Sequence, residues 1–304
     1  MGFIGVHVCR ALLMNGYHVV GFDNLSHPSI DPSGRMKSGT GDAWKNFRFY
    51  KVDIREKGPM HAMAAAERPD AIIHLAAIGS VPRSFTQPAL YTSVNCVGFL
   101  NVLELAADLR IEKMIYASSS SVYGKSPSPV RREGMEFPAA SPYALSKIHN
   151  ENAARLMSVM MNVSTLGLRF FNVYGPGQNF DSAYSAVIPK WINSERLVIN
   201  GDGETIRDFT YVGDVVDAVL LGLENQAFVA SVCNIGTGKG TTINELAEMI
   251  SQGQREIVPS KPRYGDVSAS IADVDYAEKL LGFKARVTLE EGLSKTRQFY
   301  AGMV

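Results

Sequence analysis

The sequence predicts an α/β fold, a doubly wound parallel sheet that lacks its first strand, with a smaller C-terminal α/β lobe. Apolar runs of strand length alternate with segments of helical periodicity through the first two thirds of the 304 residues. Parallel strands need crossover connections of about a dozen residues, and helices of this kind supply them. Hydrophobic residues make up 46% of the chain, and 30 basic residues balance 30 acidic ones, as in an ordinary globular domain.

The first 176 residues contain the elements of the main sheet. Short apolar runs predict strands at 18–22, 49–52, 71–76, 113–117 and 165–170. Amphipathic segments predict helices at 4–14, 58–66, 91–108 and 143–161. The segment 26–45 is rich in Ser, Gly, Pro and Asp and predicts a long loop.

Beyond residue 176 the alternation is less regular. Helices are expected at 184–194, 214–223, 242–251, 275–281 and 289–300, with short strands and Gly-rich turns between them. We therefore expect two domains, 1–176 and 177–304. The second is a lobe that closes over a ligand at the carboxyl ends of the main strands, and some of its elements return to the main sheet.

Composition excludes several classes of protein. A balanced charge and ordinary hydrophobicity disfavour a disordered chain or a nucleic-acid partner. No apolar run reaches the roughly 20 residues of a membrane helix, and no secretory signal is visible, so we expect no membrane association. Cys9, Cys96 and Cys233 are far apart, which disfavours a disulfide framework or a zinc site. We expect a cytoplasmic protein without a metal.

The N-terminus carries part of a Rossmann-like dinucleotide motif. Gly2 and Gly5 precede an amphipathic helix, and Asp23 follows the next strand about 20 residues on, where a carboxylate can accept from ribose hydroxyls. The strand and the first glycine of the motif are missing. That strand would be central in the sheet, so its absence exposes two strand edges. We expect the sequence to begin at an internal methionine of a longer reading frame; a chain that truly lacks the strand is the alternative.

The chemistry-bearing residues are Ser119, Tyr143 and Lys147. Tyr143 and Lys147 are four residues apart at the start of a predicted helix, so both lie on one helix face. A fixed ammonium beside a phenol favours the phenolate and makes it a proton acceptor. Ser119 lies in a run of four serines at the carboxyl end of a strand, where it can hydrogen-bond a sugar hydroxyl.

Four ordered motifs resemble the extended short-chain dehydrogenase/reductases, and among these the nucleotide-sugar 4-epimerases of the NAD-dependent epimerase/dehydratase family. They are the serine run ending in Val-Tyr-Gly124, Ser141-Pro-Tyr-Ala-Leu-Ser-Lys147, Arg169-Phe-Phe-Asn172-Val-Tyr-Gly-Pro, and Gly201-Asp-Gly continuing to Arg207-Asp-Phe-Thr-Tyr-Val. The resemblance extends from Gly2 over nearly the whole chain.

The resemblance implies a set of site residues. Tyr143 would remove the O4 proton of a UDP-sugar while C4 passes a hydride to NAD; the keto sugar then turns over and takes the hydride back on its other face. Ser119 matches the catalytic hydroxyl and Lys147 the ribose-binding lysine. Residues matching the NAD site, besides Tyr143 and Lys147, are Gly2, Gly5, Asp23, Asn24, Asp53, Ile54, Leu75, Ala76, Ala77 and Asn95. Residues matching the substrate site are Ser80, Ser84, Ser120, Asn172, Arg207, Arg263, Asp266 and Ser270.

Two features indicate the reaction and the sugar. Related dehydratases carry an Asp-Glu pair at the positions of Ser120 and Ser121, because eliminating water needs a further acid and base. Ser270 matches a position where a bulky tyrosine excludes an N-acetyl group, so a small residue admits one. We expect interconversion of UDP-N-acetylglucosamine and UDP-N-acetylgalactosamine, or of their uronic acids, as in polysaccharide biosynthesis. Arg83 is a candidate partner for a uronate carboxylate, with a purely structural role as its alternative.

Other interpretations remain open at this stage. The chain can be a UDP-glucose or UDP-glucuronate 4-epimerase, or a truncated, non-catalytic chain that binds a sugar nucleotide. A net oxidoreductase with exchangeable NADPH is disfavoured, because Asp23 repels a 2′-phosphate. Relatives commonly pair through helices near 91–110 and 143–161, so we also expect a homodimer.

Overall fold

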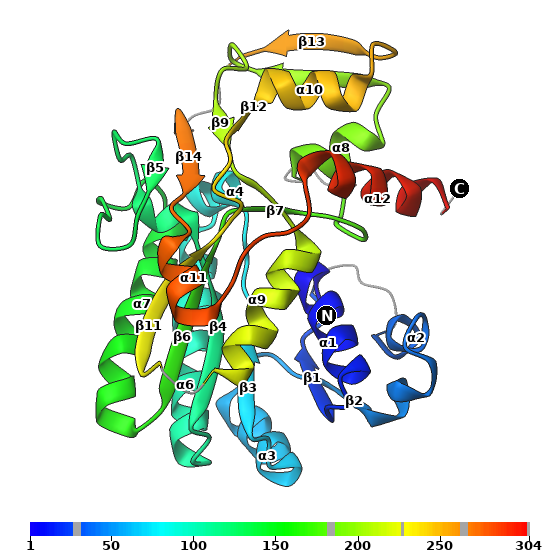
Figure 1. Cartoon of the computed structure of the whole chain (residues 1–304). Coiled ribbons are helices and arrows are strands. Elements are labelled where there is room, and N and C mark those ends of the chain that lie inside the picture. Colours follow the sequence, from blue (N-terminus) through cyan, green and yellow to red (C-terminus); the bar gives the residue numbers. More distant parts are fainter. Residues whose placement is uncertain (27–31, 181–185, 226–227, 262–266, 303–304) are drawn as a thin grey trace.

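The computed structural model describes residues 1–26, 32–180, 186–225, 228–261 and 267–302. Its main sheet has four parallel strands in the order β11-β6-β4-β3 (Figure 1). These strands are β3 (Ala71–His74), β4 (Lys113–Ser119), β6 (Ser164–Phe170) and β11 (Ala230–Ile235). β11 follows residue 177 in the chain and yet pairs with β6, so part of the C-terminal half completes this sheet. The predicted α/β class with parallel strands is confirmed.

A separate parallel pair lies beside the main sheet. β1 (Val19–Asp23) pairs with β2 (Phe47–Lys51), and no hydrogen bond joins this pair to β3 among the described residues. β1 and β3 therefore each keep one unpaired edge, as the missing first strand predicts. Met1 lies at this break, with its side chain against Gly21 of β1 and its amino group against the carboxylate of Asp23.

Helices cover both faces of the sheet. α1 (Phe3–Met14) and α9 (Val212–Glu224) pack on one face, where their apolar side chains form a single cluster with those of β4 and β6. α3 (Lys57–Glu67), α6 (Gly98–Asp108) and α7 (Pro142–Met161) form a second cluster on the other face. This two-sided cover explains why the central strands are almost continuously apolar.

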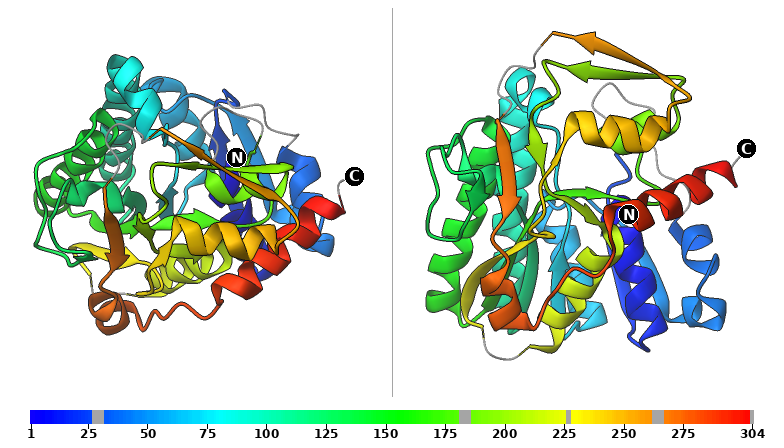
Figure 2. Two further views of the ribbon diagram at one scale, coloured as in Figure 1. Left: turned by 90° about the horizontal axis from the view of Figure 1, so that it is seen from above. Right: turned by 45° about the horizontal axis from the view of Figure 1, so that its top comes forward.

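The C-terminal lobe lies above the carboxyl ends of the main strands (Figure 2). It contains a four-stranded sheet in the order β12-β9-β14-β5 and two smaller pairs, β13-β8 and β10-β7. A third apolar cluster holds its helices against these strands. The lobe strands are β5 (Val130–Arg131), β7 (Asn172–Tyr174), β8 (Arg196–Asn200), β9 (Ile206–Arg207), β10 (Phe209–Tyr211), β12 (Thr241–Thr242), β13 (Glu256–Ser260) and β14 (Ala269–Ala272).

Capping residues account for several helix starts. Ser141 caps α7, with Pro142 in its first turn, and Thr242 with Glu245 forms a capping box at α10. Further helices are α4 (Val81–Thr86), α5 (Pro88–Tyr91), α8 (Val187–Ile192), α10 (Ile243–Ser251), α11 (Asp275–Leu281) and α12 (Leu289–Ala301), with the π-helical segment η2 (Thr92–Val97) and the 3₁₀ turn η3 (Ser120–Tyr123). The helix predicted at 184–194 thus begins at Val187, and 184–185 lie outside the described residues.

The long loop predicted at 26–45 is wrong in part. The segment contains α2 (Pro32–Lys37) and, near its end, the 3₁₀ turn η1 (Gly41–Asn46). Met36 of α2 is fully buried in the same cluster as α1, and the ammonium of Lys37 lies 4.5 Å from the ring centre of Trp44. Composition does not reveal these tertiary contacts, which stabilise a short helix that has weak propensity by itself.

The prediction that no apolar run reaches the length of a membrane helix is wrong for one helical run among the described residues. Pro88–Asp108 is long and apolar enough by composition, but half of it is buried inside the fold. Its central part packs against α7, and α6 contributes Phe99, Val102 and Leu103 to the core. This burial is typical of a core helix rather than of a lipid-facing one.

Candidate active site

Tyr143 and Lys147 project from the first turns of α7 next to the carboxyl end of β4. The ammonium of Lys147 donates to the main-chain oxygen of Ala117 at 2.7 Å and lies 6.0 Å from the ring centre of Tyr143. Lys147 is only 2% exposed, whereas Tyr143 is partly exposed. The helix spacing therefore brings the predicted base and its ammonium together, and β4 holds the ammonium in place.

Ser119 ends β4 and begins the turn η3. Its hydroxyl donates to the hydroxyl of Ser121 at 3.0 Å and accepts from the Ser121 amide at 3.2 Å. A hydrogen bond with Ser119 also acts on Tyr143, where it lowers the pKa of the phenol. The three residues predicted to carry the chemistry are thus adjacent, although they come from a strand end and a helix start.

The electrostatics of this cluster follow from burial. Burial raises the pKa of Tyr143 above its ordinary value, and the hydrogen bond from Ser119 opposes this shift. Burial lowers the pKa of Lys147 to about 8, while the carboxylate of Glu151 opposes that shift. The buried His74, at the end of β3, has a pKa lowered to about 3 by burial and by the charge of Lys147, so it stays neutral.

Sequence analysis missed two residues that support the cluster. Tyr91 packs edge-on against Tyr143, with ring centres 6.3 Å apart, and its hydroxyl donates to the main-chain oxygen of Ser80. Glu151 lies one helical turn after Lys147 and accepts from the hydroxyl of Ser118 and from Arg169. The spacing of Glu151 from Lys147 is visible in the sequence and would have indicated a carboxylate near the ammonium.

The start of α1 has the shape of a phosphate site. A Cβ built on Gly2 or on Gly5 meets no atom within 4 Å, so open space lies beside both glycines. The first amide N–H groups of a helix have no partner within it and carry a partial positive charge. Space and charge of this kind suit the pyrophosphate of a dinucleotide, and the assignment of Gly2 and Gly5 to that group stays a prediction.

The carboxylates predicted near the ribose and the adenine are both engaged. Asp23 accepts from the amide of Leu25 at 2.7 Å and contacts the amino group of Met1. Asn24 donates to Asp53 at 2.8 Å. Arg55 binds Asp53 through both side-chain and main-chain N–H groups and holds the pKa of that carboxyl well below its usual range.

The other residues predicted to line the cofactor lie along the ends of β2 and β3. The side chain of Ile54 packs in the core against Gly98 of α6. Leu75, Ala76 and Ala77 directly follow β3; Leu75 and Ala76 are partly buried and Ala77 is exposed. Asn95 is buried on η2. Its side-chain oxygen accepts from the amide of Ile78 and its side-chain nitrogen donates to the main-chain oxygen of Ile78, so it fixes the segment after β3.

A cavity of about 210 Å³ lies between the main sheet and the lobe. It brings together four of the residues predicted to bind substrate: Ser120, Asn172, Arg207 and Ser270. The other lining residues are Val81, Ser121, Gly124, Arg131, Ala140, Ser141, Ala144 and Val267. The lining combines small residues, both polar and apolar, with two arginines, and it contains no aromatic side chain and no carboxylate among the described residues.

Ser80 and Ser84, also predicted to bind substrate, do not line this cavity. Ser80 caps α4 by accepting from the Arg83 amide, and Ser84 is fully buried and donates to the main-chain oxygen of Val81. Both hydroxyls thus have partners within their own helix. Arg263 and Asp266 lie outside the described residues.

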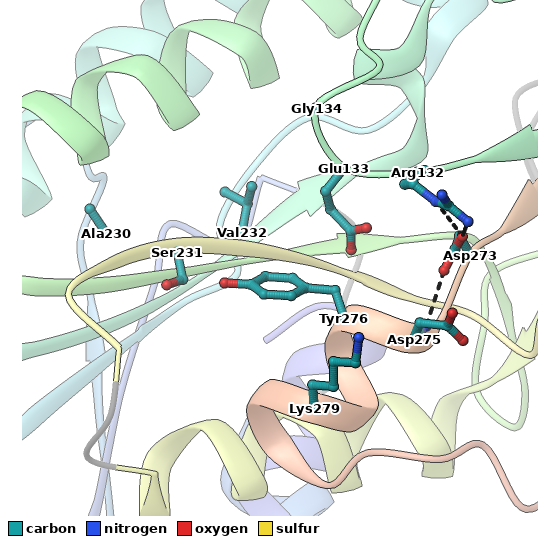
Figure 3. Close-up of a pocket in the computed structure, with 10 residues that line it drawn as sticks. All are labelled: Arg132, Glu133, Gly134, Ala230, Ser231, Val232, Asp273, Asp275, Tyr276 and Lys279. Carbon is teal, nitrogen blue, oxygen red and sulfur yellow. Dashed lines mark hydrogen bonds and ion pairs between the residues drawn. The ribbon is translucent and has the colours of Figure 1, made fainter.

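A larger cavity, of about 620 Å³, lies at the edge of the main sheet that β11 forms (Figure 3). It lies along β11 and includes Glu133 and the ring of Tyr276, and the ion pair between Arg132 and Asp273 closes one side. None of the predicted site residues lines it. We therefore do not assign this cavity as the reaction site, although it is larger than the cavity of about 210 Å³.

A family model described as the NAD-dependent epimerase/dehydratase family matches residues 1–236. The chain belongs to this family. It is 33% identical over 309 residues to the UDP-glucose 4-epimerase of Mycolicibacterium smegmatis. This match covers 98% of this chain and 96% of that protein.

Two solved structures extend this finding. The UDP-N-acetylglucosamine 4-epimerase of Methanobrevibacter ruminantium, in complex with UDP-N-acetylmuramic acid, is 33% identical, with a TM-score of 0.91, covering 100% of this chain and 96% of that one. MoeE5 in complex with UDP-glucuronic acid and NAD is 32% identical, with a TM-score of 0.88, covering 100% and 97%. This member of the NAD-dependent epimerase/dehydratase family therefore has the family fold along its whole length, and its cofactor is NAD.

Proposed function

We propose that this enzyme interconverts UDP-N-acetylglucosamine and UDP-N-acetylgalactosamine, or their uronic acids, through a transient 4-keto sugar. The broader class, an NAD-dependent UDP-sugar 4-epimerase and hence an isomerase, follows from the family and its relatives. The observation that supports the N-acetyl preference is Ser270, a small residue that is only 6% exposed and lines the cavity of about 210 Å³.

The chain's own groups account for the proton transfer. Tyr143 accepts the proton from O4 of the sugar, because Lys147 and Ser119 both stabilise its phenolate. Gly2 and Gly5 would hold the pyrophosphate of NAD, Asp23 its ribose, and Lys147 the ribose near the reacting atoms. When bound, NAD supplies the acceptor, and later the donor, of the hydride at C4. Arg207 and Asn172 would bind the diphosphate of the substrate.

The sugar must present both faces to the same hydride site. The cavity wall consists of hydroxyls, an amide, two guanidinium groups and small apolar groups, and such a wall offers hydrogen bonds to a sugar in either orientation. Ser120 and Ser121 stand where an acid and a base would be needed for dehydration, so epimerisation without loss of water is the reaction that these residues fit.

The direct test is to incubate the enzyme with UDP-N-acetylglucosamine and NAD, and to follow the anomeric protons by NMR. Appearance of UDP-N-acetylgalactosamine supports the proposal. NAD-loaded enzyme that converts UDP-glucose or UDP-glucuronate but not the N-acetyl sugar would replace it with one of these alternatives. Folded protein that binds a UDP-sugar but no NAD would favour a non-catalytic chain.

Quaternary structure is part of the proposal. α7 carries exposed apolar side chains at Leu145, Leu156, Val159, Met160 and Met161, and Val159 is 77% exposed. Ala154 faces the core, so these five residues, and not Ala154, are available for a second copy of the chain. We expect a cytoplasmic homodimer that pairs through α6 and α7. Sedimentation should show Val159→Asp as a monomer, whereas Val229→Asp, an equal change at an exposed residue off this face, should leave the dimer intact.

We also propose that the two domains bind different ligands. Residues 1–176 would bind NAD, and residues 177–304 would mainly bind the sugar nucleotide. Arg207 and Ser270 on the lobe, opposite Ser120 on the main domain, fit this division.

A further inference from the structure

Arg131 carries a buried positive charge at the wall of the smaller cavity. It ends the short strand β5, and its side chain is only 2% exposed. Its guanidinium donates to the main-chain oxygens of Ser126 at 3.0 Å, of Ala269 at 2.5 Å, and of Ser128. These three carbonyls tie the loop after η3 to β14 and fix the guanidinium in place.

No carboxylate among the described residues pairs with this charge. The partners of Arg131 are main-chain carbonyls, which satisfy N–H groups but do not neutralise a cation. A guanidinium has five N–H groups, so three bonds leave two of them. Buried charges in proteins are normally paired, and an unpaired one at a cavity wall indicates an anionic ligand.

Arg131 and Arg207 lie on opposite sides of Ser270. In the lobe sheet, β14 lies between β9 and β5 (Figure 1), and Ser270 of β14 is opposite Arg207 of β9. Burial, and then the like charge of Arg207, lowers the pKa of Arg131. The cavity therefore carries two guanidinium groups and no described carboxylate. One diphosphate accounts for Arg207, and Arg131, on the strand at the other side of β14, remains as a second cation for a further anionic group of the ligand.

Arg83, considered above for a uronate, is placed differently. Its guanidinium donates to the side chain of Gln87 one turn along the same helix, and it does not line the cavity. Arg131 is thus the better-placed cation for a group on the sugar.

We propose that Arg131 binds a carboxylate carried by the sugar, so that the enzyme prefers the uronic-acid form of its UDP-sugar over the neutral form. This rests on the proposed function and narrows its substrate class. The hydrogen bonds to the carboxylate are charge-assisted, and such bonds are worth about 10- to 100-fold in affinity.

The test compares binding of UDP-glucuronate and UDP-glucose by calorimetry, for the NAD-loaded wild type and for Arg131→Gln. The two probes share the nucleotide and the diphosphate, so the contribution of Arg207 cancels in the ratio of their affinities. The wild type should bind UDP-glucuronate at least about 10-fold more tightly. Arg131→Gln should abolish this ratio by weakening UDP-glucuronate alone. Binding needs no turnover, so the outcome is independent of whether the epimerase assay succeeds.

Two further variants separate recognition from loop structure. Arg131→Lys keeps the charge with fewer donors and should keep part of the preference, which provides a second reading if the glutamine variant folds poorly. Arg132→Gln is the matched control: this neighbour is 64% exposed and paired with Asp273, and its loss should not change the ratio. Equal binding of both probes by the wild type, or equal weakening of both by Arg131→Gln and Arg131→Lys, would overturn the proposal.

Discussion

The ammonium of Lys147 donates to the main-chain oxygen of Ala117 at a distance of 2.7 Å, so the start of α7 is fixed to the end of β4. This hydrogen bond fixes the positions of Lys147 and of Tyr143, one helical turn before it, relative to the main sheet. It also buries a charge, and the consequences of that burial can be measured.

Burial of Lys147 should make stability depend on pH. Its pKa is lowered to about 8 in the folded protein, against about 10.4 in an unfolded chain. Between these values the unfolded chain binds more protons, so the Lys147 contribution to the free energy of unfolding rises with pH. Below about pH 8 Lys147 is protonated in the folded and in the unfolded chain, so the full cost of burying its charge is subtracted from the free energy of unfolding. Lys147→Met should lack this rise when unfolding by urea is compared from pH 7.5 to 10; parallel curves for the two proteins would contradict the assignment.

Replacing Tyr143 by Phe should remove catalysis and keep binding. Loss of a general base costs roughly 100- to 10,000-fold in rate. The phenyl ring retains its edge-on packing against Tyr91, so the fold and the affinity for a UDP-sugar should be nearly unchanged. Turnover and calorimetric binding, measured on the same preparation, check both statements. A variant that keeps a tenth or more of the wild-type rate would show that another group is the base.

Ser119→Ala should move the pH profile of the reaction. The hydrogen bond from Ser119 lowers the pKa of Tyr143, so without it this pKa should rise further and the rising limb of kcat should shift to higher pH. Ser119→Thr keeps a hydroxyl and should keep the wild-type profile. If alanine lowers kcat equally at every pH, Ser119 acts on the substrate and not through Tyr143.

Gly5→Ala should weaken NAD binding without harming the fold. A methyl group there meets no protein atom within 4 Å, and alanine is about 1 kcal/mol better than glycine inside a helix. The same methyl would enter the space assigned to the pyrophosphate, so the affinity for NAD should fall about 10-fold or more. Gly58→Ala in α3 is the control for the gain in helix propensity, since it also meets no atom within 4 Å and α3 contains none of the residues predicted to bind NAD. Unchanged NAD affinity in Gly5→Ala would remove Gly5 from the site.

Gly124→Ala should destabilise the protein and distort the cavity wall. Gly124 has φ of 55°, and a Cβ there would lie 2.3 Å from the main-chain oxygen of Pro138. Left-handed strain and overpacking together cost about 2 to 6 kcal/mol. The free energy of unfolding should therefore fall by that amount, while Gly58→Ala should stay within about 1 kcal/mol of the wild type. Equal stability of the two variants would contradict this description of the turn.

The sequence by itself determined the class of the fold and the chemistry of its centre. Apolar runs of strand length alternate with segments of helical periodicity, and this order specifies parallel strands with helical crossovers. A buried strand and a helix each need their own apolar period and length. The spacing of Tyr143 and Lys147 specifies a shared helix face, and the serine run at a strand end specifies where Ser119 lies. These are local properties, so one sequence suffices to predict them. For the same reason the incomplete glycine motif predicted open strand edges, and β1 and β3 each have one among the described residues.

Only the tertiary structure decided which distant residues meet. Met36 becomes a core residue and makes a helix of a segment predicted as loop, because α1 lies over it. Ser80 and Ser84 turn their hydroxyls into their own helix, although their place in the sequence resembles a substrate contact. Arg131, in contrast, is an unremarkable surface-like residue in the sequence, and it becomes a buried cation at the cavity because β5 pairs with β14, more than a hundred residues away. Such contacts depend on strand pairing across the lobe, which no local pattern specifies.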